Sequence, residues 1–341
     1  MRVALDCMGG DRGPVTTITG ALEAASLNPE LIIVLVGDQE TIHSILAKHK
    51  RSYRPQQIEV VHASDEITMD DSPAQAARQK KKSSMHVANQ LVKDGQADAV
   101  FTAGNTGAAM GVSLLTLGRI PGIIRPALMV NIPSLTRHGW SSVLDVGANV
   151  DCKPKMLAQF AVMGDLYHRN LLNVPSPRVG LLSLGEEDSK GNELIRETHE
   201  ILRGLKHIHF IGNVEGQDLV NGRADVVVCD GFVGNVILKF GEGIMRLFGD
   251  ILKREVLNGN LFTKLTVGLL TPTIRRIYRR MDYKEYGSAP LLGVNGISTI
   301  GHGKSNSKAI KSAILHAARY VSAHINDKIE LALRENGVAE L

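Results

Sequence analysis

The chain has 341 residues, of which 43% are hydrophobic and 22% are charged, so it contains enough apolar sequence for one or two packed domains. Aromatic residues make up only 4%, which argues against a stacking platform for nucleic-acid bases. The cysteines Cys7, Cys152 and Cys229 are too few for a disulfide framework or a zinc site. A strand pattern begins at Arg2 with no apolar leader before it, and together these features favour the cytoplasm.

Short apolar runs rich in Val, Ile and Leu predict strands that are covered on both faces. In chain order they are Arg2–Leu5, Leu31–Val36, Ile58–His62, Ala99–Thr102, Ala127–Ile132, Val143–Asp145, Arg178–Leu184, His209–Gly212 and Val226–Cys229. Helical patterns alternate with them at Val15–Ser26, Thr41–Lys48, Pro73–Gln79, Met85–Lys93, Pro154–Tyr167, Asn192–Leu202 and Lys308–Leu333. This alternation predicts an α/β protein with a doubly wound, mainly parallel, three-layer α/β/α sandwich.

No low-complexity linker divides the chain, so we expect residues 1–341 to form a single α/β domain, in which two lobes around a cleft are an option. Residues 99–118 carry no charge and resemble a membrane span, but Gly104, Asn105, Thr106 and Gly107 interrupt them. A buried strand, turn and helix explain this run better than a span does.

Residues 236–286 contain little strand pattern and are expected to form a helical segment that protrudes from the sandwich. Within it, Thr271 and Pro272 are typical of a helix N-cap and first helical residue. The helix that would follow places Ile274 and Ile277 on an apolar face. The opposite face carries four arginines, Arg275, Arg276, Arg279 and Arg280. Such a helix suits an anionic membrane surface or an acidic protein partner. The alternative is a helix that packs its apolar stripe on the core and solvates its arginines.

Seven tight turns rich in Gly, Asn and Asp each follow an apolar run. They lie at residues 6–11, 103–107, 145–151, 185–192, 212–216, 230–235 and 301–306. In a parallel sheet, such turns meet at the carboxyl edge, where helix N-termini present free N–H groups to anions. We therefore expect one long cleft for an anionic, phosphate-bearing substrate.

Several well-known signatures are absent. Gly303-Lys304-Ser305 resembles the end of a P-loop, but Ser298 stands where the first glycine belongs. No G-x-G-x-x-G follows a strand, no second histidine completes a zinc-protease motif after His199-Glu200, and G-x-S-x-G does not occur. Kinase, zinc-protease and serine-hydrolase functions are all disfavoured.

The remaining polar residues predict an anion site. Asn105, Thr106 and Gly107 begin a helix after a strand and could bind phosphate through N–H, hydroxyl and amide groups, although a simple tight turn is the alternative. Lys81, in a run of three lysines, either enters the cleft or belongs to a solvated face. His302, between two glycines at a strand end, is the candidate general acid among the histidines; the alternative is a loop histidine without a role.

The aspartates near the turns either bind a metal or cap the turns. They are Asp6, Asp11, Asp145, Asp151 and Asp230. Their spacing matches no defined metal site, so we expect capping and no metal. The cysteines also neighbour the turns, which would suit a covalent acyl-enzyme. No histidine is paired with them in sequence, so small buried residues are the preferred interpretation.

Taken together, these strings resemble one family, the phosphate acyltransferases of bacterial phospholipid synthesis, or acyl-ACP:phosphate transacylases. The resemblance covers nearly the whole chain, with a departure at Arg12-Gly13, where the family pattern has His-Ala. The strings that carry it are Asp6–Asp11, Lys80–Met85, Ala103–Ala108, Asp145–Pro154, Lys190–Leu194, Gly212–Gly216, Cys229–Val236, Asp282–Gly287 and Ala289–Gly296.

The resemblance implies transfer of a long-chain acyl group from acyl carrier protein to inorganic phosphate. It also implies a homodimer, loose membrane association, contact with a membrane-bound glycerol-3-phosphate acyltransferase, and a fold like isocitrate and isopropylmalate dehydrogenases and phosphotransacetylases. No cofactor and no nucleic acid are expected. Acyl-chain length and the partner of the basic helix, lipid or carrier protein, stay open.

For this chemistry we expect direct displacement, because phosphate is already an ionised nucleophile. Asn149 or Asn235 would donate to the oxyanion, and His302 or Lys190 would assist the leaving thiolate. The same cleft is expected to be lined by Asn213 and by the aspartates Asp6, Asp11, Asp151 and Asp230. Two other functions remain as alternatives: a hydroxy-acid dehydrogenase on a related fold, and a non-catalytic protein that docks carrier protein at the membrane.

Overall fold

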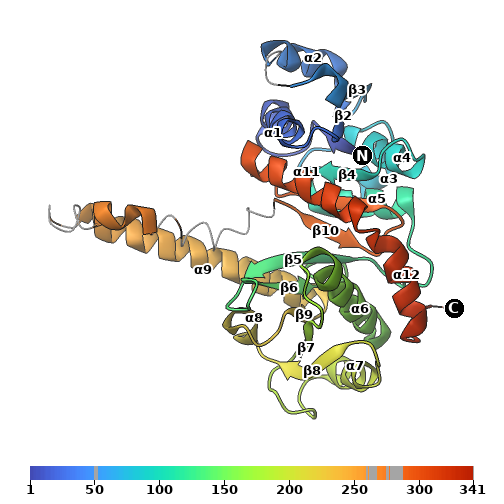
Figure 1. The fold of residues 1–341 in the computed structure, drawn as a ribbon, viewed down its shortest axis with the longest axis vertical. Coiled ribbons are helices and arrows are strands. Elements are labelled where there is room, and N and C mark those ends of the chain that lie inside the picture. The colour runs from blue at the N-terminus through green and yellow to red at the C-terminus, as the bar shows by residue number, and fades with distance from the viewer. Residues whose placement is uncertain (50–52, 259, 261–266, 274–275, 277–286, 341) are drawn as a thin grey trace.

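A computed structural model describes residues 1–49, 53–258, 260, 267–273, 276 and 287–340 (Figure 1). These residues build one 11-stranded sheet in the order β3-β2-β1-β4-β11-β10-β5-β6-β9-β7-β8. The strands are β1 Arg2–Asp6, β2 Ile32–Gly37, β3 Ile58–His62, β4 Ala99–Thr102, β5 Ala127–Pro133, β6 Trp140–Leu144, β7 Arg178–Leu182, β8 His209–Val214, β9 Val226–Val228, β10 Ala289–Leu292 and β11 Ile297–Ile300.

The sheet consists of two parallel halves that run in opposite directions. In the first half, β3, β2, β1, β4 and β11 are parallel, and in the second half β6, β9, β7 and β8 are parallel. Between them, β10 pairs antiparallel with both β11 and β5, and β5 pairs antiparallel with β6. The expectation of a mainly parallel sheet is confirmed, but the direction changes in the middle.

The helices are α1 Gly13–Leu27, α2 Gln39–Lys48, α3 Pro73–Gln79, α4 Ser84–Lys93, α5 Thr106–Leu117, α6 Pro154–Leu171, α7 Glu193–Arg203, α8 Asp218–Asn221, α9 Gly231–Asn258, α11 Ser307–Ser322 and α12 Ile325–Glu335, with a short 3-10 turn at Pro55–Gln57. The strand, turn and helix predicted for residues 99–118 are confirmed. One predicted helix, Lys308–Leu333, is wrong as a continuous element, because His324 has a left-handed backbone (φ 49°) that separates α11 from α12.

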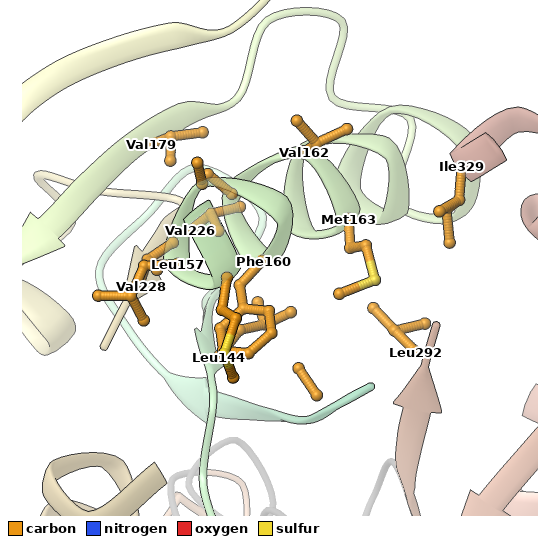
Figure 2. Packing of buried hydrophobic residues seen from close by; sticks show 14 of the residues in the cluster. Leu144, Leu157, Phe160, Val162, Met163, Val179, Val226, Val228, Leu292 and Ile329 are labelled. Atoms are coloured by element: carbon orange, nitrogen blue, oxygen red, sulfur yellow. The ribbon is translucent and has the colours of Figure 1, made fainter. Parts of the chain in front are cut away.

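Successive residues of each strand contribute to different sides of the sheet, as strand geometry requires. In β1, Val3 and Leu5 belong to the hydrophobic cluster under α1 and α11, whereas Ala4 belongs to the cluster under α4. In the second half, Leu144, Val226 and Val228 pack with Phe160 of α6 (Figure 2). Both faces are therefore buried under helices, and the three-layer architecture is confirmed.

The apolar runs did not predict β10 and β11. Both are only four residues long, β10 contains Pro290, and β11 carries the polar residues Ser298 and Thr299. These polar side chains are nevertheless buried, and Ser298 Oγ lies 2.9 Å from Ser113 Oγ of α5. Because a proline and two hydroxyl residues weaken the apolar signal, periodicity alone misses these central strands.

Helix α9 extends away from the sandwich (Figure 1), and its buried residues are Gly231 and Gly234 near its first turn. Residues 267–273 are also helical, and Thr271 Oγ1 donates back to the Val267 carbonyl at 2.9 Å. The prediction that a helix begins at Thr271 is therefore wrong. Arg276 is exposed, whereas Ile274, Arg275, Ile277, Arg279 and Arg280 lie outside the described residues. Across the described ranges, no helix is both long and apolar enough to cross a membrane.

Candidate functional site

The predicted polar turns fall into two groups because the sheet reverses direction. The first group follows β1, β4 and β11, and the second follows β6, β9, β7 and β8. The expectation that all of them share one carboxyl edge is wrong, because antiparallel pairing at β10 and β5 places the ends of the two halves at opposite edges of the sheet. One buried hydrophobic cluster links the groups: it contains Met85 and Ile300 beside the first, and Val146 and Cys229 beside the second.

Asp6 organises the first group. Its carboxylate is 1% exposed and accepts hydrogen bonds of 2.6 Å from the hydroxyls of Ser84 and Thr102, and further bonds from the N–H groups of Met8 and Gly9. Burial raises the pKa of Asp6. A Cβ placed on Gly9 would lie 2.8 Å from the Gly104 nitrogen. Asp6 thus holds two glycine turns against each other, a capping task of the kind expected for these aspartates.

Asn105 caps helix α5 rather than presenting a free amide. Its Oδ1 accepts from the Ala108 N–H at 3.1 Å, and its Nδ2 donates to the carbonyls of Met69 and Asp71 at 3.3 and 3.2 Å. The predicted binding of phosphate by the Asn105 side chain is therefore not supported. The N–H groups of Thr106 and Gly107 remain at the open end of α5, next to a neutral cap, and such an end attracts anions.

The lysine run directs Lys80, rather than Lys81, toward the first group. Lys80 Nζ lies 2.8 Å from Asp71 Oδ2 and 2.9 Å from the Glu66 carbonyl, and Asp71 in turn holds Asn105. Lys81 Nζ donates to the Ala77 carbonyl at 3.2 Å and lines a surface cavity with Leu115 and Thr116, at the far end of α5. The prediction that Lys81 helps to hold phosphate beside Asn105 is not supported by this position.

His302 and Asp11 come together in the first group. The Asp11 N–H donates to the Gly303 carbonyl at 2.8 Å, and the Lys304 N–H donates to His302 Nδ1 at 3.0 Å. His302 is exposed, and this contact leaves its Nδ1 in the role of acceptor. His302 therefore lies with the Thr106 group of turns and not with Lys190 or Asn235.

Asp145 organises the second group in the way that Asp6 organises the first. It is fully buried, and it accepts hydrogen bonds from the N–H groups of Leu128, Gly147, Ala148 and Asn149. Burial raises the pKa of this carboxyl as well. Asp145 was not among the predicted site residues, although it opens one of the strings that carry the resemblance.

The side-chain amide of Asn149 is fully used within the protein. Its Nδ2 donates to the Pro126 carbonyl at 2.7 Å and to Asp145 Oδ2 at 2.9 Å, so both amide protons have partners. The prediction that this amide donates to an oxyanion is therefore not supported. The backbone carbonyl of Asn149 instead accepts a hydrogen bond from the Gly231 N–H at 2.8 Å, which connects the turn to the start of α9.

Asn235 lies in the first turns of α9, beside the 145–149 turn. A Cβ placed on Gly147 would lie 3.7 Å from Asn235 Cβ. Asp230 caps the same helix end, since its Oδ1 accepts the Val233 N–H at 2.9 Å. Unlike Asn149, Asn235 has no described hydrogen bond to its amide among residues 53–258, so this side chain can serve as a donor. Asp151 is exposed.

Lys190 and Asn213 meet in the second group through a shared acceptor, the carbonyl of Glu187. The Lys190 N–H donates to it at 2.9 Å and Asn213 Nδ2 donates at 2.8 Å. Lys190 is exposed, and Asn213 is 1% exposed. The second group thus combines a lysine, an asparagine amide and a helix start at the ends of neighbouring strands.

The cysteines are unsuited to nucleophilic chemistry. Cys7 and Cys229 are buried, and desolvation raises the pKa of each thiol; desolvation also raises the pKa of Cys152 to about 12. Each is therefore protonated near neutral pH, in agreement with the preferred interpretation. Within the described residues, no group of three or more His, Cys, Asp and Glu side chains could hold a metal ion.

The fold is that of the phosphotransacetylases. A phosphotransacetylase from Streptococcus pyogenes superposes with a TM-score of 0.64 at 17% identity, covering 94% of both chains. The phosphotransacetylase EutD from Staphylococcus aureus gives 0.61 at 15% identity, also covering 94% of both. At these identities, the likeness defines the class of fold: a two-directional α/β sheet with polar turns at strand ends.

The sequence comparisons are more specific. Residues 1–328 match the family of fatty acid synthesis proteins, and the chain belongs to that family. Phosphate acyltransferase from Trichlorobacter lovleyi is 47% identical over 98% of this chain and 95% of its own length. Phosphate acyltransferase from Heliobacterium modesticaldum is 48% identical over 97% and 99%. The resemblance found in the sequence is confirmed: this is an enzyme family of acyl transfer in lipid synthesis.

Proposed function

We propose that the protein transfers a long-chain fatty acyl group from acyl carrier protein to inorganic phosphate, which yields acyl phosphate and free carrier protein for phospholipid synthesis. Membership of the phosphate acyltransferase family supports the reaction class. The observation that carries the proposal in this chain is the arrangement of Lys190 and Asn235 at the ends of neighbouring strands. Neither side chain is consumed by the described structural contacts.

The reaction proceeds by direct displacement. A phosphate oxygen attacks the thioester carbon, a C–O bond replaces the C–S bond, and the thiolate leaves with a proton. No oxidation state changes, so no cofactor is proposed. Holding the two reactants in the reactive orientation lowers the activation barrier by up to about 7–11 kcal/mol. Each hydrogen-bond donor to the tetrahedral oxyanion lowers it by about 2.7–4 kcal/mol.

The N-terminus of α5 holds the phosphate through the N–H groups of Thr106 and Gly107 and the Thr106 hydroxyl. Its cap, Asn105, is neutral, whereas α9 begins with the carboxylate of Asp230, which repels an anion. Asn235 donates to the oxyanion, and Lys190 protonates the leaving thiolate. This assignment requires the two groups of turns to approach the same reactants across the face of the sheet, beside the hydrophobic cluster that borders both groups.

The reaction is tested by incubating the purified protein with palmitoyl-acyl carrier protein and phosphate, without ATP or coenzyme A. Acyl phosphate is trapped with hydroxylamine and the freed thiol is titrated. Equal, phosphate-dependent formation of both products is expected. Formation of neither product, while carrier protein still binds, would contradict the proposal and favour a docking protein. Binding and oxidation of NAD(P)H would favour a dehydrogenase.

The residue assignments are tested separately. Thr106→Ala is expected to raise the phosphate KM, and Asn235→Ala is expected to lower kcat by about 10²–10³-fold, as loss of an oxyanion donor does. Asp151→Ala, an exposed change outside the proposed contacts, is the control. Unchanged phosphate kinetics in Thr106→Ala would remove α5 from the site. His302→Ala tests the alternative general acid.

Helix α9 supports a homodimer. Its exposed apolar side chains recur every three or four residues, which is typical of a helix-pairing seam. They are Val236, Phe240, Ile244, Leu247 and Ile251, each at least 48% exposed. A second copy of α9 covers this seam. Phe240→Glu with Ile244→Glu should yield monomers in light scattering, whereas Lys239→Glu should not. A dimer that survives the double change would place the interface elsewhere.

We propose that residues 1–341 form one enzyme that acts in the cytoplasm. Its segment 236–286 is proposed to contact the membrane surface or carrier protein. Four arginines, Arg275, Arg276, Arg279 and Arg280, would supply about 4 kcal/mol of attraction to anionic lipid. Reversing these charges should weaken binding to anionic vesicles or to carrier protein, which identifies the partner. No change in either would make the segment structural. Contact with a membrane-bound glycerol-3-phosphate acyltransferase would follow from vesicle binding.

A further inference from the structure

Two buried polar atoms lie unpaired beneath the 185–192 turn. Ser183 Oγ and Asn213 Oδ1 are both inaccessible to solvent, and neither has a hydrogen-bond partner among the described residues. Ser183 follows β7, and Asn213 lies near the end of β8, the neighbouring strand. Buried polar atoms are normally paired, because leaving them unpaired is costly. Each of the two atoms can therefore accept a hydrogen bond from a further donor.

The orientation of the Asn213 amide is set by its own contact. Nδ2 donates to the Glu187 carbonyl at 2.8 Å, so the other end of the amide is the oxygen, an acceptor only. The unsatisfied group is thus a carbonyl oxygen that requires an N–H or O–H donor. Ser183 Oγ can accept as well as donate. An ammonium group carries three protons and can donate to acceptors of both kinds.

Two cations lie beside this position: Lys190, and Arg196, whose guanidinium is already engaged because it donates to the Gly191 carbonyl at 2.9 Å. The Lys190 N–H donates to the same Glu187 carbonyl at 2.9 Å, which makes its backbone a neighbour of the Asn213 amide. A Cβ placed on Gly191 would lie 3.2 Å from Ser183 Oγ, so the turn lies directly on that hydroxyl. The flexible four-carbon stem of lysine carries three donors and no acceptor.

The other charged side chains of the turn are engaged elsewhere or lie outside this position. Glu186 pairs with Arg223, and Asp188 lies 3.3 Å from His199 and 3.6 Å from Arg203. The Glu187 carboxylate and the Lys190 stem both lie against Gly185: a Cβ placed there would be 2.9 Å from Glu187 Oε2 and 3.1 Å from Lys190 Cγ. The Lys190 ammonium has no described hydrogen bond within residues 53–258 and can turn inward.

We propose that Ser183 and Asn213 are positioning residues for Lys190. When the acyl thioester binds, the ammonium turns inward. Two of its N–H groups then donate hydrogen bonds, one to Ser183 Oγ and one to Asn213 Oδ1. The third proton then faces the leaving sulfur. As the C–S bond breaks, this proton moves to the thiolate, and the neutral amine regains a proton from water. The inference rests on the proposed role of Lys190, and it adds the residues that orient that side chain and stabilise its charged form.

The test is a double-mutant cycle on the full-length enzyme, assayed by acyl phosphate formation over a range of pH. Ser183→Ala removes one acceptor, so kcat should fall about tenfold, and the alkaline limb of its pH profile should move to lower pH because the ammonium loses a stabilising partner. Ser183→Thr keeps the hydroxyl and should restore both kcat and the position of the alkaline limb. In a Lys190→Ala background, Ser183→Ala should change kcat less than about twofold.

Three outcomes overturn the inference. The alkaline limb could stay in place in Ser183→Ala, the effects of Ser183→Ala and Lys190→Ala could multiply in the double variant, or Asn213→Ala could be additive with Lys190→Ala. Any of these would leave the two atoms paired by a buried water or another group. Full activity in Lys190→Ala would instead contradict the proposed role of Lys190, and a protein without any activity would contradict the proposed function. Circular dichroism and thermal unfolding of each variant identify a folding failure.

Discussion

Gly234 lies directly against the carbonyl oxygen of Asp145, and a side chain at position 234 would collide with that oxygen and approach Cys229 Sγ. This contact joins the first turn of α9 to the turn after β6. The Asp145 carboxylate simultaneously holds the N–H groups of residues 147–149. The position of Asn235 therefore depends on a helix whose glycine fits a backbone held by a buried carboxylate.

The first prediction concerns Gly234. Gly234→Ala should lower the free energy of unfolding by at least about 1–3 kcal/mol, the usual cost of overpacking a filled site. Acyl transfer should fall with it, because α9 can no longer seat against Asp145. Gly241→Ala in the same helix is the matched control: nothing lies within 4 Å of its added methyl, and alanine should stabilise the helix by about 1 kcal/mol. Urea unfolding measures the free energy of unfolding of both variants, and an equal change in the two variants would disprove the contact.

The second prediction concerns Asp6. Asp6→Ala leaves the hydroxyls of Ser84 and Thr102 and two backbone N–H groups without their acceptor. At about 1–3 kcal/mol for each buried group left unpaired, the free energy of unfolding should fall by at least about 3 kcal/mol. Asp11→Ala, an exposed aspartate in the same turn, should change it by less than about 0.5 kcal/mol. A small effect of Asp6→Ala in chemical denaturation would contradict this role.

The third prediction is a pH dependence that originates at Asp165. Burial raises the pKa of this carboxyl from 3.8 to about 6 despite its pairing with Arg169 at 2.7 Å. Because the folded pKa is the higher one, the contribution is fully present below pH 3.8 and is lost as the pH rises through about 6. At 1.36 kcal/mol per pKa unit, the loss is about 3 kcal/mol.

Asp165→Asn removes this titration. The difference in unfolding free energy between the wild type and the variant should therefore shift in favour of the variant between pH 4 and pH 7. Asp6 and Asp145 titrate in both proteins and cancel in the difference. A difference that stays constant across this range would show that Asp165 has an ordinary pKa. Urea titrations at successive pH values provide the measurement.

The fourth prediction concerns the thiols. Because desolvation raises the pKa of all three cysteines, iodoacetamide at pH 7.5 should leave acyl transfer unchanged over a time in which glutathione is fully alkylated. Cys152→Ser should likewise retain activity. No acyl-enzyme should appear in intact-mass spectra after mixing with acyl carrier protein. A stable mass increase of one acyl group, absent in Cys152→Ser, would overturn direct displacement.

Local sequence was sufficient to predict several elements to the residue. β3 at Ile58–His62, β4 at Ala99–Thr102 and α3 at Pro73–Gln79 lie where the pattern placed them. The reversal of the sheet was missed, although a signal existed. The connection between β5 and β6 covers only residues 134–139, which is too short for the crossover that parallel strands require.

The candidate site was predicted unevenly for a similar reason. Turn chemistry correctly marks the start of a helix at Asn105, whereas residues 231–235, predicted as part of a turn, already belong to α9. It does not reveal whether a side chain is already used by its neighbours. Asn149 and Asn235 look equivalent in sequence, yet both amide protons of Asn149 are bound within the protein. Lys80 and Lys81 are adjacent in the chain and diverge, since one side chain reaches Asp71 and the other lines a cavity along α5.

The sequence by itself determined the three-layer α/β class, most strands and helices, the enzyme family and the set of polar turns, because these depend on local periodicity, turn residues and characteristic strings. Only the tertiary structure decided that the turns form two groups, that Asp6 and Asp145 are the buried carboxylates that hold them, and that Ser183 Oγ and Asn213 Oδ1 are buried without a partner beneath the turn that carries Lys190. These are consequences of strand order and direction. Pairing between distant segments determines them, and the residues within each segment do not record which partner that segment will meet.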